Sequence, residues 1–391
     1  MAAFFCFFMK RIIAGVILSF LIFSLFSFES VDSVLNNMTL EEKVGQLFVI
    51  RPESIDLEIL HQEKELKKDI GITKLNRNSI DFYNKYPAGG FILFNRNIVD
   101  PEQLTEFTKE LHILGNVKPL IFIDEEGGSV ARIARTKTFE VEKFTNMRSL
   151  GSTGSLETVF NAGITIGNYL KKYGIDVDFA PVADVDTNPD NPVIGNRAFS
   201  SDPYIAAEMA LAFLQGLEKT GVEGCFKHFP GHGDTNTDTH LGYTEIRKNL
   251  KELYGCELIP FQYGISNDIP MIMIAHISLP QVTYNKMPAS LSYEIITELL
   301  KRDLGYKGLI ITDSLSMKAV TNIYSPEEAA VETILAGSDF ILLPENYEKA
   351  FYAVYNAVIS GIIPEERINE SVLKILNFKK KFIKNDAFPL D

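Results

Sequence analysis

Three of the six histidines in the chain fall within residues 227 to 242, which read "KHFPGHGDTNTDTHLG". Glycine, proline, threonine and asparagine are frequent in this segment and favour an irregular loop over a helix or strand. Asp238 and His240 lie two residues apart in the loop, so the carboxylate can bond one imidazole nitrogen, fix the tautomer of the ring and raise its basicity. The pair therefore predicts a general acid/base, with His240 carrying the proton and Asp238 orienting the ring.

The same histidines raise the alternative of a metal site. His228 directly follows Lys227, whose positive charge would repel a cation, and the His-x-His strand pair of barrel metallohydrolases is missing. We therefore expect no metal and no other cofactor. Nucleotide cofactors are not implied either, because the phosphate-binding and dinucleotide-binding glycine fingerprints are absent. His232, which is flanked by glycines, is expected to order the loop through hydrogen bonds.

A second candidate for chemistry is Asp313, which ends the apolar part of the run "GLIITDSLSM". A carboxylate at this point suits a nucleophile that attacks the anomeric carbon of a sugar, because the oxocarbenium-like transition state gains from an adjacent negative charge. The alternative is a cap at the start of the following helix, a position that aspartate also favours. Position alone leaves both interpretations open.

Two more segments carry charged side chains that suit the hydroxyl groups of a sugar. The run "IDEEGGSVARI" places Asp124 after an apolar run, two glycines that allow a close turn past a ligand, and then Arg132. The run "GNRAFSSDP" offers Arg197 in a loop. Both arginines fit structural ion pairs equally well, so these residue types alone do not decide the role.

Eight short apolar runs alternate with longer amphipathic segments, and they read "GQLFVI", "GGFILF", "LIFIDEE", "VDFAPVAD", "GCFKHFP", "PMIMIAH", "GLIITDS" and "DFILLP". Such runs suit parallel strands buried on both faces, and the segments between them suit helices. One of these segments has Ser325 at a predicted N-cap and Pro326 in the first turn. Eight alternations predict an α/β fold that is a single (β/α)8 barrel of the TIM type.

Charged and polar side chains follow nearly all of these runs. Because the carboxyl ends of barrel strands converge on one face, which is where barrel enzymes place their chemistry, the pattern predicts one site there. Its candidate members are Arg51, Asn95, Asp124, Asp184, Lys227, His228, His276 and Asp313. Residues 53 to 86, rich in Lys and Glu, predict an extra solvated helix and loop, to which we assign no chemistry.

The first 28 residues differ from the rest of the chain. Lys10 and Arg11 precede an apolar run of seventeen residues, which predicts an export signal or a membrane anchor and hence a periplasmic or extracellular protein. The small-x-small cleavage pattern is poor, so cleaved and anchored forms are both open, and a buried N-terminal helix is the remaining alternative. We expect residues 29 to 391 to form one catalytic domain.

Charge and cysteine content exclude several classes of protein. The formal net charge is −13 and no basic run is present, so we expect no nucleic-acid partner. The chain has three cysteines, one of which lies in the predicted export segment, so at most one disulfide can form. No CxxC spacing or Cys/His zinc pattern occurs, which leaves redox and structural-metal roles without support.

Taken in order, "IDEEGGSVARI", "GNRAFSSDP", "KHFPGHGDTNTDTH" and "ITDSLSM" resemble glycoside hydrolase family 3, specifically its β-N-acetylglucosaminidase branch. The resemblance covers nearly all of residues 34 to 380. It implies that Asp313 is the nucleophile, His240 the acid/base and Asp238 its orienting partner. It also implies a set of residues that hold the sugar, namely Asp124, Arg132, Arg197, Lys227 and His228.

The reaction implied by the resemblance is a retaining, two-step hydrolysis of terminal β-linked N-acetylglucosamine, from peptidoglycan fragments or other amino-sugar oligosaccharides. Two alternatives within the family are a β-glucosidase and a glycosyl phosphorylase. The phosphorylase is an alternative because a histidine in place of the usual carboxylic acid leaves less negative charge near the acceptor. A non-catalytic sugar-binding barrel is the alternative of another class, and the presence of Asp313 together with the Asp238–His240 pair disfavours it.

Overall fold

The computed structural model describes residues 30–239 and 241–383. The chain divides into two compact units, residues 1–38 and 39–391. In the first unit the described part contains helix α2 (Val31–Asn37), which begins where the Ser30 hydroxyl accepts a hydrogen bond from Ser33 N–H. The predicted export segment, residues 1–28, lies outside the described residues. Each helix within the described ranges is too short or too polar to cross a bilayer.

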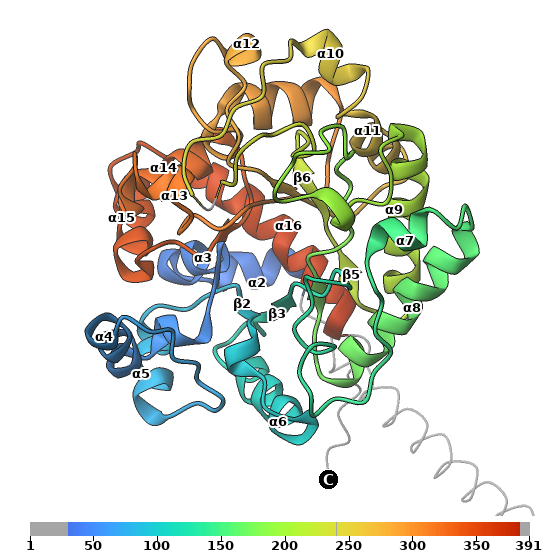
Figure 1. The fold of residues 1–391 in the computed structure, drawn as a ribbon. Helices are drawn as coiled ribbons and strands as arrows, with labels where there is room; N and C mark the ends of the chain where they lie inside the picture. The colour runs from blue at the N-terminus through green and yellow to red at the C-terminus, as the bar shows by residue number, and fades with distance from the viewer. Residues whose placement is uncertain (1–29, 240, 384–391) are drawn as a thin grey trace, which may run out of the picture. The chain divides into compact units, whose positions relative to one another are not determined.

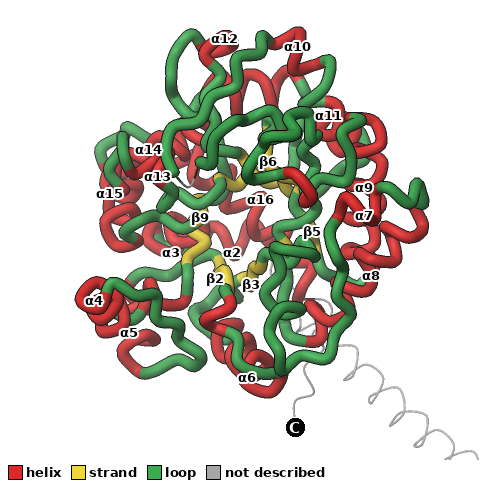
Figure 2. Tube along the Cα trace, viewed as in Figure 1, coloured by secondary structure: helices red, strands yellow, loops and turns green. Residues whose placement is uncertain are grey.

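The second unit is built on parallel strands that lie at its centre, with the long helices around them (Figures 1 and 2). One ladder has the order β5-β4-β3-β2-β1-β9 and the other β6-β7-β8. The strands are β1 (Phe48–Ile50), β2 (Gly90–Leu93), β3 (Leu120–Ile123), β4 (Val177–Asp178), β5 (Glu223–Gly224), β6 (Phe226–Phe229), β7 (Met271–Ile274), β8 (Leu309–Thr312) and β9 (Ile341–Leu342).

The two ladders join into one ring. Only Cys225 separates β5 from β6, so these two pieces are one interrupted strand. One parallel bridge pairs Val182, which follows β4, with Lys227 of β6. A second parallel bridge pairs Ile311 of β8 with Phe340, which directly precedes β9. The described part of the chain thus forms an eight-stranded, all-parallel closed barrel. All eight predicted strands are present, and the predicted (β/α)8 fold is confirmed.

The helices follow the strands along the chain as the alternating pattern predicts. The longer ones are α6 (Pro101–His112), α8 (Leu156–Lys172), α9 (Pro203–Lys219), η5 (Glu294–Asp303), α14 (Pro326–Ala336), α15 (Tyr347–Ile359) and α16 (Glu365–Ile383), and helix α11 (Ile259–Ile265) is shorter. Shorter ones are α3 (Leu40–Gln46), α7 (Met147–Gly151), α10 (Leu250–Tyr254), α12 (Pro280–Thr283), α13 (Lys318–Thr321), η2 (Asn95–Asn97), η3 (Gly195–Arg197) and η4 (Ala289–Leu291).

Helix α14 begins as the sequence predicts. The Ser325 hydroxyl accepts a hydrogen bond from Glu328 N–H at 3.2 Å, and the Glu328 carboxylate accepts one from Ser325 N–H at 2.9 Å. Pro326 occupies the first turn, where its missing N–H is not needed. This reciprocal cap satisfies two backbone donors that the helix itself leaves unpaired.

Aromatic and branched side chains fill the inside of the barrel below the site. Phe122 on β3 stacks on Phe179 at a centroid distance of 5.1 Å and meets the edge of Phe340 at 6.0 Å. All three side chains are fully buried, and each contributes roughly 2 to 3 kcal/mol through burial. This apolar layer closes the barrel interior beneath the carboxyl ends of the strands, where the site residues lie.

The segment after β1 contains η1 (Pro52–Ile55) and two helices, α4 (Leu57–Leu66) and α5 (Arg77–Lys85). Two buried carboxylates hold it together. Glu53 accepts hydrogen bonds from Ile72 N–H at 3.0 Å and from the Asn97 side chain at 2.5 Å. Asp56 accepts one from the Asn76 side chain at 2.7 Å. The predicted extra helix is therefore a pair of helices with polar internal anchoring.

Candidate active site

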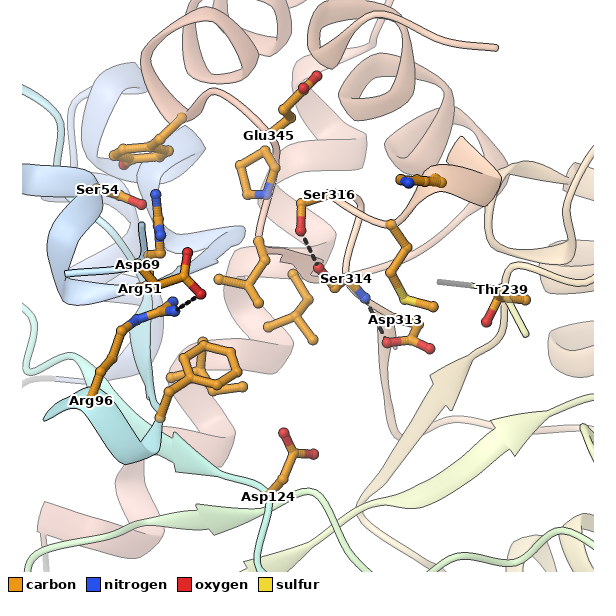
Figure 3. A pocket seen from close by; sticks show the side chains of 18 of the residues that line it. Arg51, Ser54, Asp69, Arg96, Asp124, Thr239, Asp313, Ser314, Ser316 and Glu345 are labelled. Carbon is orange, nitrogen blue, oxygen red and sulfur yellow. Dashed lines mark hydrogen bonds and ion pairs between the residues drawn. The ribbon is translucent and has the colours of Figure 1, made fainter. Parts of the chain in front are cut away.

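A cavity of about 1040 Å³ opens at the carboxyl ends of the strands (Figure 3). Of the eight residues that the family resemblance assigns to catalysis or sugar binding, six line it, although they come from separate parts of the chain: Asp124, Arg132, Arg197, Lys227, His228 and Asp313. Thr239, which lies between the predicted acid/base pair, lines it too. His240 lies outside the described residues, so its place in the site stays a prediction.

The Lys227 side chain sits at the bottom of the site between two acids. Its ammonium nitrogen is 2.9 Å from Asp124 Oδ1 and 2.6 Å from Glu126 Oε1, and the residue is only 2% exposed. A buried ammonium needs such partners, because an unpaired charge in this environment would cost several kcal/mol. Burial lowers the pKa of Lys227, but the two carboxylates outweigh it and raise the pKa above its ordinary value. The group therefore stays charged.

Glu126 also binds Arg197, which reaches it from η3. The two carboxylate oxygens accept from Arg197 Nη2 at 2.7 Å and Nε at 2.8 Å, a bidentate pair. Burial raises the pKa of Glu126, but Arg197 and Lys227 together hold it well below its usual range. Arg197 is thus a partner in an ion pair with Glu126 and also lines the cavity, while its part in binding a sugar stays a prediction. Glu126 was missed in the sequence analysis.

Asp124 completes the charge cluster. Its second oxygen accepts from Arg132 Nη2 at 3.1 Å, and its side chain is 17% exposed on the cavity side. Burial raises the pKa of Asp124, yet Lys227 and Arg132 hold it below the ordinary value. The cavity therefore presents an ionised carboxylate beside fixed cations, a set of acceptors and donors that suits sugar hydroxyls.

The middle acid of the "DEE" run, Glu125, points away from the cavity and is fully buried. Its oxygens accept hydrogen bonds from Ile133 N–H at 2.9 Å, from Ala134 N–H at 2.8 Å and from the Tyr169 hydroxyl at 3.0 Å. A further bond comes from the backbone N–H of Arg132. Glu125 therefore fixes the turn that aims the Arg132 side chain at Asp124.

His228 is held by Asp184, a fully buried acid at the end of the β4 segment. The Nδ1 atom of His228 lies 2.7 Å from Asp184 Oδ2, while Asp184 Oδ1 accepts from the backbone N–H groups of His228 and His232 at 3.1 and 2.6 Å. Burial raises the pKa of Asp184, but the interaction with His228 outweighs it and lowers the pKa. Because an ionised carboxylate can only accept, Nδ1 carries the proton and a neutral ring keeps Nε2 as an acceptor.

His232 orders the loop, as expected from its sequence. Its Nδ1 lies 2.8 Å from the Thr235 hydroxyl, and its carbonyl accepts from the Asn191 side chain at 2.8 Å. Burial, with the neighbouring His228, lowers the pKa of His232 to about 4, so the ring is neutral at physiological pH. Among the described residues no group of three His, Cys, Asp or Glu side chains is arranged to hold a metal.

Asp313 enters the cavity from the end of β8. Its backbone N–H donates to Ile274 O on β7 at 2.8 Å, and its Oδ1 accepts from Ser314 N–H at 2.7 Å. In Figure 3 the carboxylate lies near Thr239 and across the cavity from Arg96. The next helix, α13, starts after Met317 and takes no cap from Asp313. The helix-cap interpretation is therefore wrong, and the carboxylate is left facing the cavity.

The loop of the predicted acid/base pair runs beside the chain that follows Asp313. The carbonyl of Thr239 accepts from Ala319 N–H of α13 at 3.2 Å, and Leu241 N–H donates to Asp238 O at 2.9 Å. At the base of the loop the hydroxyls of Thr237 and Thr244 lie 2.9 Å apart. The contact with Ala319 places the backbone of Thr239 beside the β8 end of the cavity, and the other two contacts lie within the loop itself.

The segment after β1, to which we assigned no chemistry, forms a wall of the cavity. Glu63 of α4 accepts from Arg51 Nη2 at 2.7 Å and from Nη1 at 3.3 Å, and Asp69 pairs with Arg96 Nη1 at 2.9 Å. All four residues line the cavity. In Figure 3 the Arg96–Asp69 pair lies on the side opposite Asp313. The Lys- and Glu-rich composition of residues 53 to 86 predicted a solvated helix and loop, whereas the structure shows that part of this segment lines the cavity.

The chain is similar in sequence to known glycosyl hydrolases. The family model of the glycosyl hydrolase family 3 N-terminal domain, which describes the sequences of that family, matches residues 39–378 of this chain. Beta-hexosaminidase A of Pseudoalteromonas piscicida is 34% identical over 345 residues, which are 81% of this chain and 57% of that protein. A beta-hexosaminidase of Neisseria meningitidis serogroup C is 36% identical over 266 residues, 66% of this chain and 71% of that protein.

Solved structures agree with these relatives. A glycoside hydrolase family 3 beta-N-acetylglucosaminidase from Paenibacillus sp. superposes with a TM-score of 0.81 at 34% identity, over 90% of this chain and 64% of that chain. This chain spans little more than half of the Pseudoalteromonas protein and just under two thirds of the Paenibacillus chain. The matched length, the barrel and the order of the motifs lead to one conclusion: this chain belongs to glycosyl hydrolase family 3 through the N-terminal-type domain of that family.

Proposed function

We propose that the protein is a retaining β-N-acetylhexosaminidase that removes terminal, non-reducing β-linked N-acetylglucosamine. The observation that carries the proposal is the position of Asp313, a carboxylate at a strand end that faces the same cavity as the buried Asp124–Lys227–Glu126 cluster. The names of the similar proteins, beta-hexosaminidases and a beta-N-acetylglucosaminidase, support the choice of sugar.

The reaction would run in two displacements at the anomeric carbon. In the first, Asp313 attacks this carbon, the bond to the leaving oxygen breaks, and the His240 imidazolium gives its proton to that oxygen. In the second, water loses a proton to His240 and attacks the same carbon, which releases Asp313. Each displacement inverts the configuration, so the product retains it. Asp238 would set the orientation and basicity of the imidazole.

The charge cluster would bind the sugar and hold it in place. Asp124 would accept from sugar hydroxyls, while Arg132, Arg197, Lys227 and His228 would complete the ring of polar contacts. Because the described members of the cluster already bond one another, they need little rearrangement when substrate enters. Fixed charges of this kind act more strongly in a water-poor site than mobile groups do in solvent.

Release of nitrophenol from two matched substrates tests the sugar and the reaction type. We expect the nitrophenyl β-N-acetylglucosaminide to be hydrolysed far faster than the β-glucoside, with no effect of a chelator and with the free sugar as product. A β-glucosidase would reverse the preference, and a phosphorylase would yield sugar phosphate when phosphate is added. A non-catalytic sugar-binding barrel would bind N-acetylglucosamine but release no nitrophenol.

Replacement of His240 by alanine should separate the two chemical steps. We expect a loss of roughly 10² to 10⁴-fold on natural disaccharides. Formation of the glycosyl-enzyme from a dinitrophenyl N-acetylglucosaminide should be nearly normal, because that leaving group needs no proton. The intermediate should then accumulate, as mass spectrometry after brief exposure would show. Asp238→Ala should give a milder form of the same pattern, and an equal loss on good and poor leaving groups would refute the assignment of His240.

For the place of action we propose export from the cytoplasm, with peptidoglycan fragments or other amino-sugar oligosaccharides as substrates. Support comes from Lys10 and Arg11 followed by the apolar run, which is typical of an export signal or anchor. Cell fractionation checks this proposal. Full-length protein recovered free in the cytoplasm would contradict it.

A further inference from the structure

His276 is a buried histidine that the proposed reaction does not yet use. It follows β7, is 1% exposed and makes two hydrogen bonds of good length. Its Nε2 lies 2.8 Å from the carbonyl oxygen of Ser314, and its Nδ1 lies 2.6 Å from the hydroxyl of Ser290. Both partners are far from His276 in the sequence, so these contacts depend on the fold.

The partners of the ring fix its tautomer. A carbonyl oxygen can only accept, so Nε2 of His276 must carry a proton and donate to Ser314 O. In the neutral ring Nδ1 then accepts from the Ser290 hydroxyl. Ser290 lies in η4, and its own backbone N–H donates to Ala275 O at 3.2 Å, next to His276. This hydrogen bond holds Ser290 beside the segment after β7 that contains His276.

Ser314 connects this histidine to the candidate nucleophile. The N–H of Ser314 donates to Asp313 Oδ1 at 2.7 Å, and the carbonyl of Ser314 accepts from His276 and also from Met317 N–H at 3.1 Å. Asp313 itself donates its N–H to Ile274 O on β7. The β7 segment thus holds the chain around the carboxylate at two points, through Ile274 before it and through His276 after it.

We infer that His276 is a positioning residue for Asp313 and acts through the peptide groups of Ser314. The inference rests on the proposed function and adds to it the part that aims the nucleophile. A displacement of about 1 Å in a reacting group can cost roughly 10²-fold in rate, so a turn that carries a nucleophile benefits from a second fixed point. The proposed sugar contacts come from other strands, so the loss of the hydrogen bond between His276 and Ser314 should leave sugar binding intact.

Two amide replacements separate the bonds of His276. The amide of glutamine reaches about as far as Nε2, so His276→Gln can still donate to Ser314 O. The shorter asparagine reaches about as far as Nδ1, so His276→Asn can keep Ser290 but loses Ser314. We expect His276→Asn to slow formation of the glycosyl-enzyme from a dinitrophenyl N-acetylglucosaminide by roughly 10 to 10²-fold. His276→Gln should stay within a few-fold of the unmodified protein, and both should bind N-acetylglucosamine with unchanged Kd.

Thermal unfolding of the two variants is the matched control, because a purely structural histidine would lower Tm and rate together in both. Equal rate losses in the glutamine and asparagine variants, or a loss that appears in Kd, would overturn the inference. If both variants fail to fold, Ser290→Ala decides. It should reduce glycosyl-enzyme formation a few-fold with unchanged Kd, and an unchanged rate would overturn the inference. An unmodified protein without activity on any of these sugars would instead refute the proposed function, and this inference with it.

Discussion

Replacement of Asp313 by alanine should lower kcat/KM by roughly 10⁴-fold or more, because no other carboxylate is proposed to attack the anomeric carbon. The expected loss is in the chemical steps, since the buried charge cluster that would bind the sugar is intact in this variant. Rapid quenching with a 2-deoxy-2-fluoro or dinitrophenyl N-acetylglucosaminide, followed by mass spectrometry, should detect a sugar adduct on the unmodified protein and none on the variant.

A small anion provides the control for this variant. The shortened side chain leaves room in the cavity, so azide should take the place of the carboxylate and restore part of the turnover of an activated substrate. Attack by azide inverts the anomeric carbon once, so the product should be the α-glycosyl azide. A labelled Asp313→Ala protein, or a normal rate without azide, would show that another residue is the nucleophile.

Replacement of Lys227 by methionine should have the second largest effect, this time on both stability and binding. The change keeps the length of the side chain but leaves Asp124 and Glu126 facing each other without the shared cation. Removal of one partner from a buried ion pair typically costs about 3 to 5 kcal/mol. Urea denaturation should show this loss at neutral pH, and affinity for N-acetylglucosamine should fall as well. A stability loss below about 1 kcal/mol would contradict the structural role of Lys227.

The difference in stability between the unmodified protein and the Lys227→Met variant should change with pH in a defined direction. Asp124 and Glu126 have folded pKa values below the ordinary ones, so their contribution to stability is complete above the ordinary carboxyl range and is lost as the pH falls through the folded values. Lys227 has a raised pKa, so its contribution is complete below about pH 10.5 and is lost above it. Without the lysine the two carboxylates should take up protons more readily. The stability gap between the two proteins should therefore narrow from pH 7 to pH 4, and a constant gap would argue against this coupling.

The barrel was predictable from the sequence because its signals are local. A buried parallel strand reads as a short apolar run, and the side chain that follows it must leave the apolar interior at the carboxyl end. Asp124 and Asp313 follow this rule, Lys227 lies within β6, and the structure places all three around one cavity. The cap at Ser325 is also a local signal, because it depends only on Ser325, Pro326 and Glu328.

Pairings between distant segments could not be predicted in this way. In the "DEE" run three acids stand in a row, and only the fold shows that Glu126 meets Arg197 while Glu125 turns toward the backbone. The contact of Asp184 with His228 spans 44 residues and left no local pattern. The wall after β1 was missed because its charged side chains pair with residues outside the segment, Glu63 with Arg51 and Asp69 with Arg96, and composition alone does not show such pairs.

The burial of the charge cluster has a consequence for the effect of salt. At moderate ionic strength, dissolved ions largely screen the interaction between exposed charges that lie more than about 8 to 10 Å apart. Buried pairs are screened much less. Lys227 and Glu126 have side chains only 2% and 1% exposed, and a terminal N-acetylglucosamine carries no charge of its own. A neutral sugar held by such groups should be bound almost equally well in dilute and in concentrated salt, so ionic strength should change the affinity of the site very little.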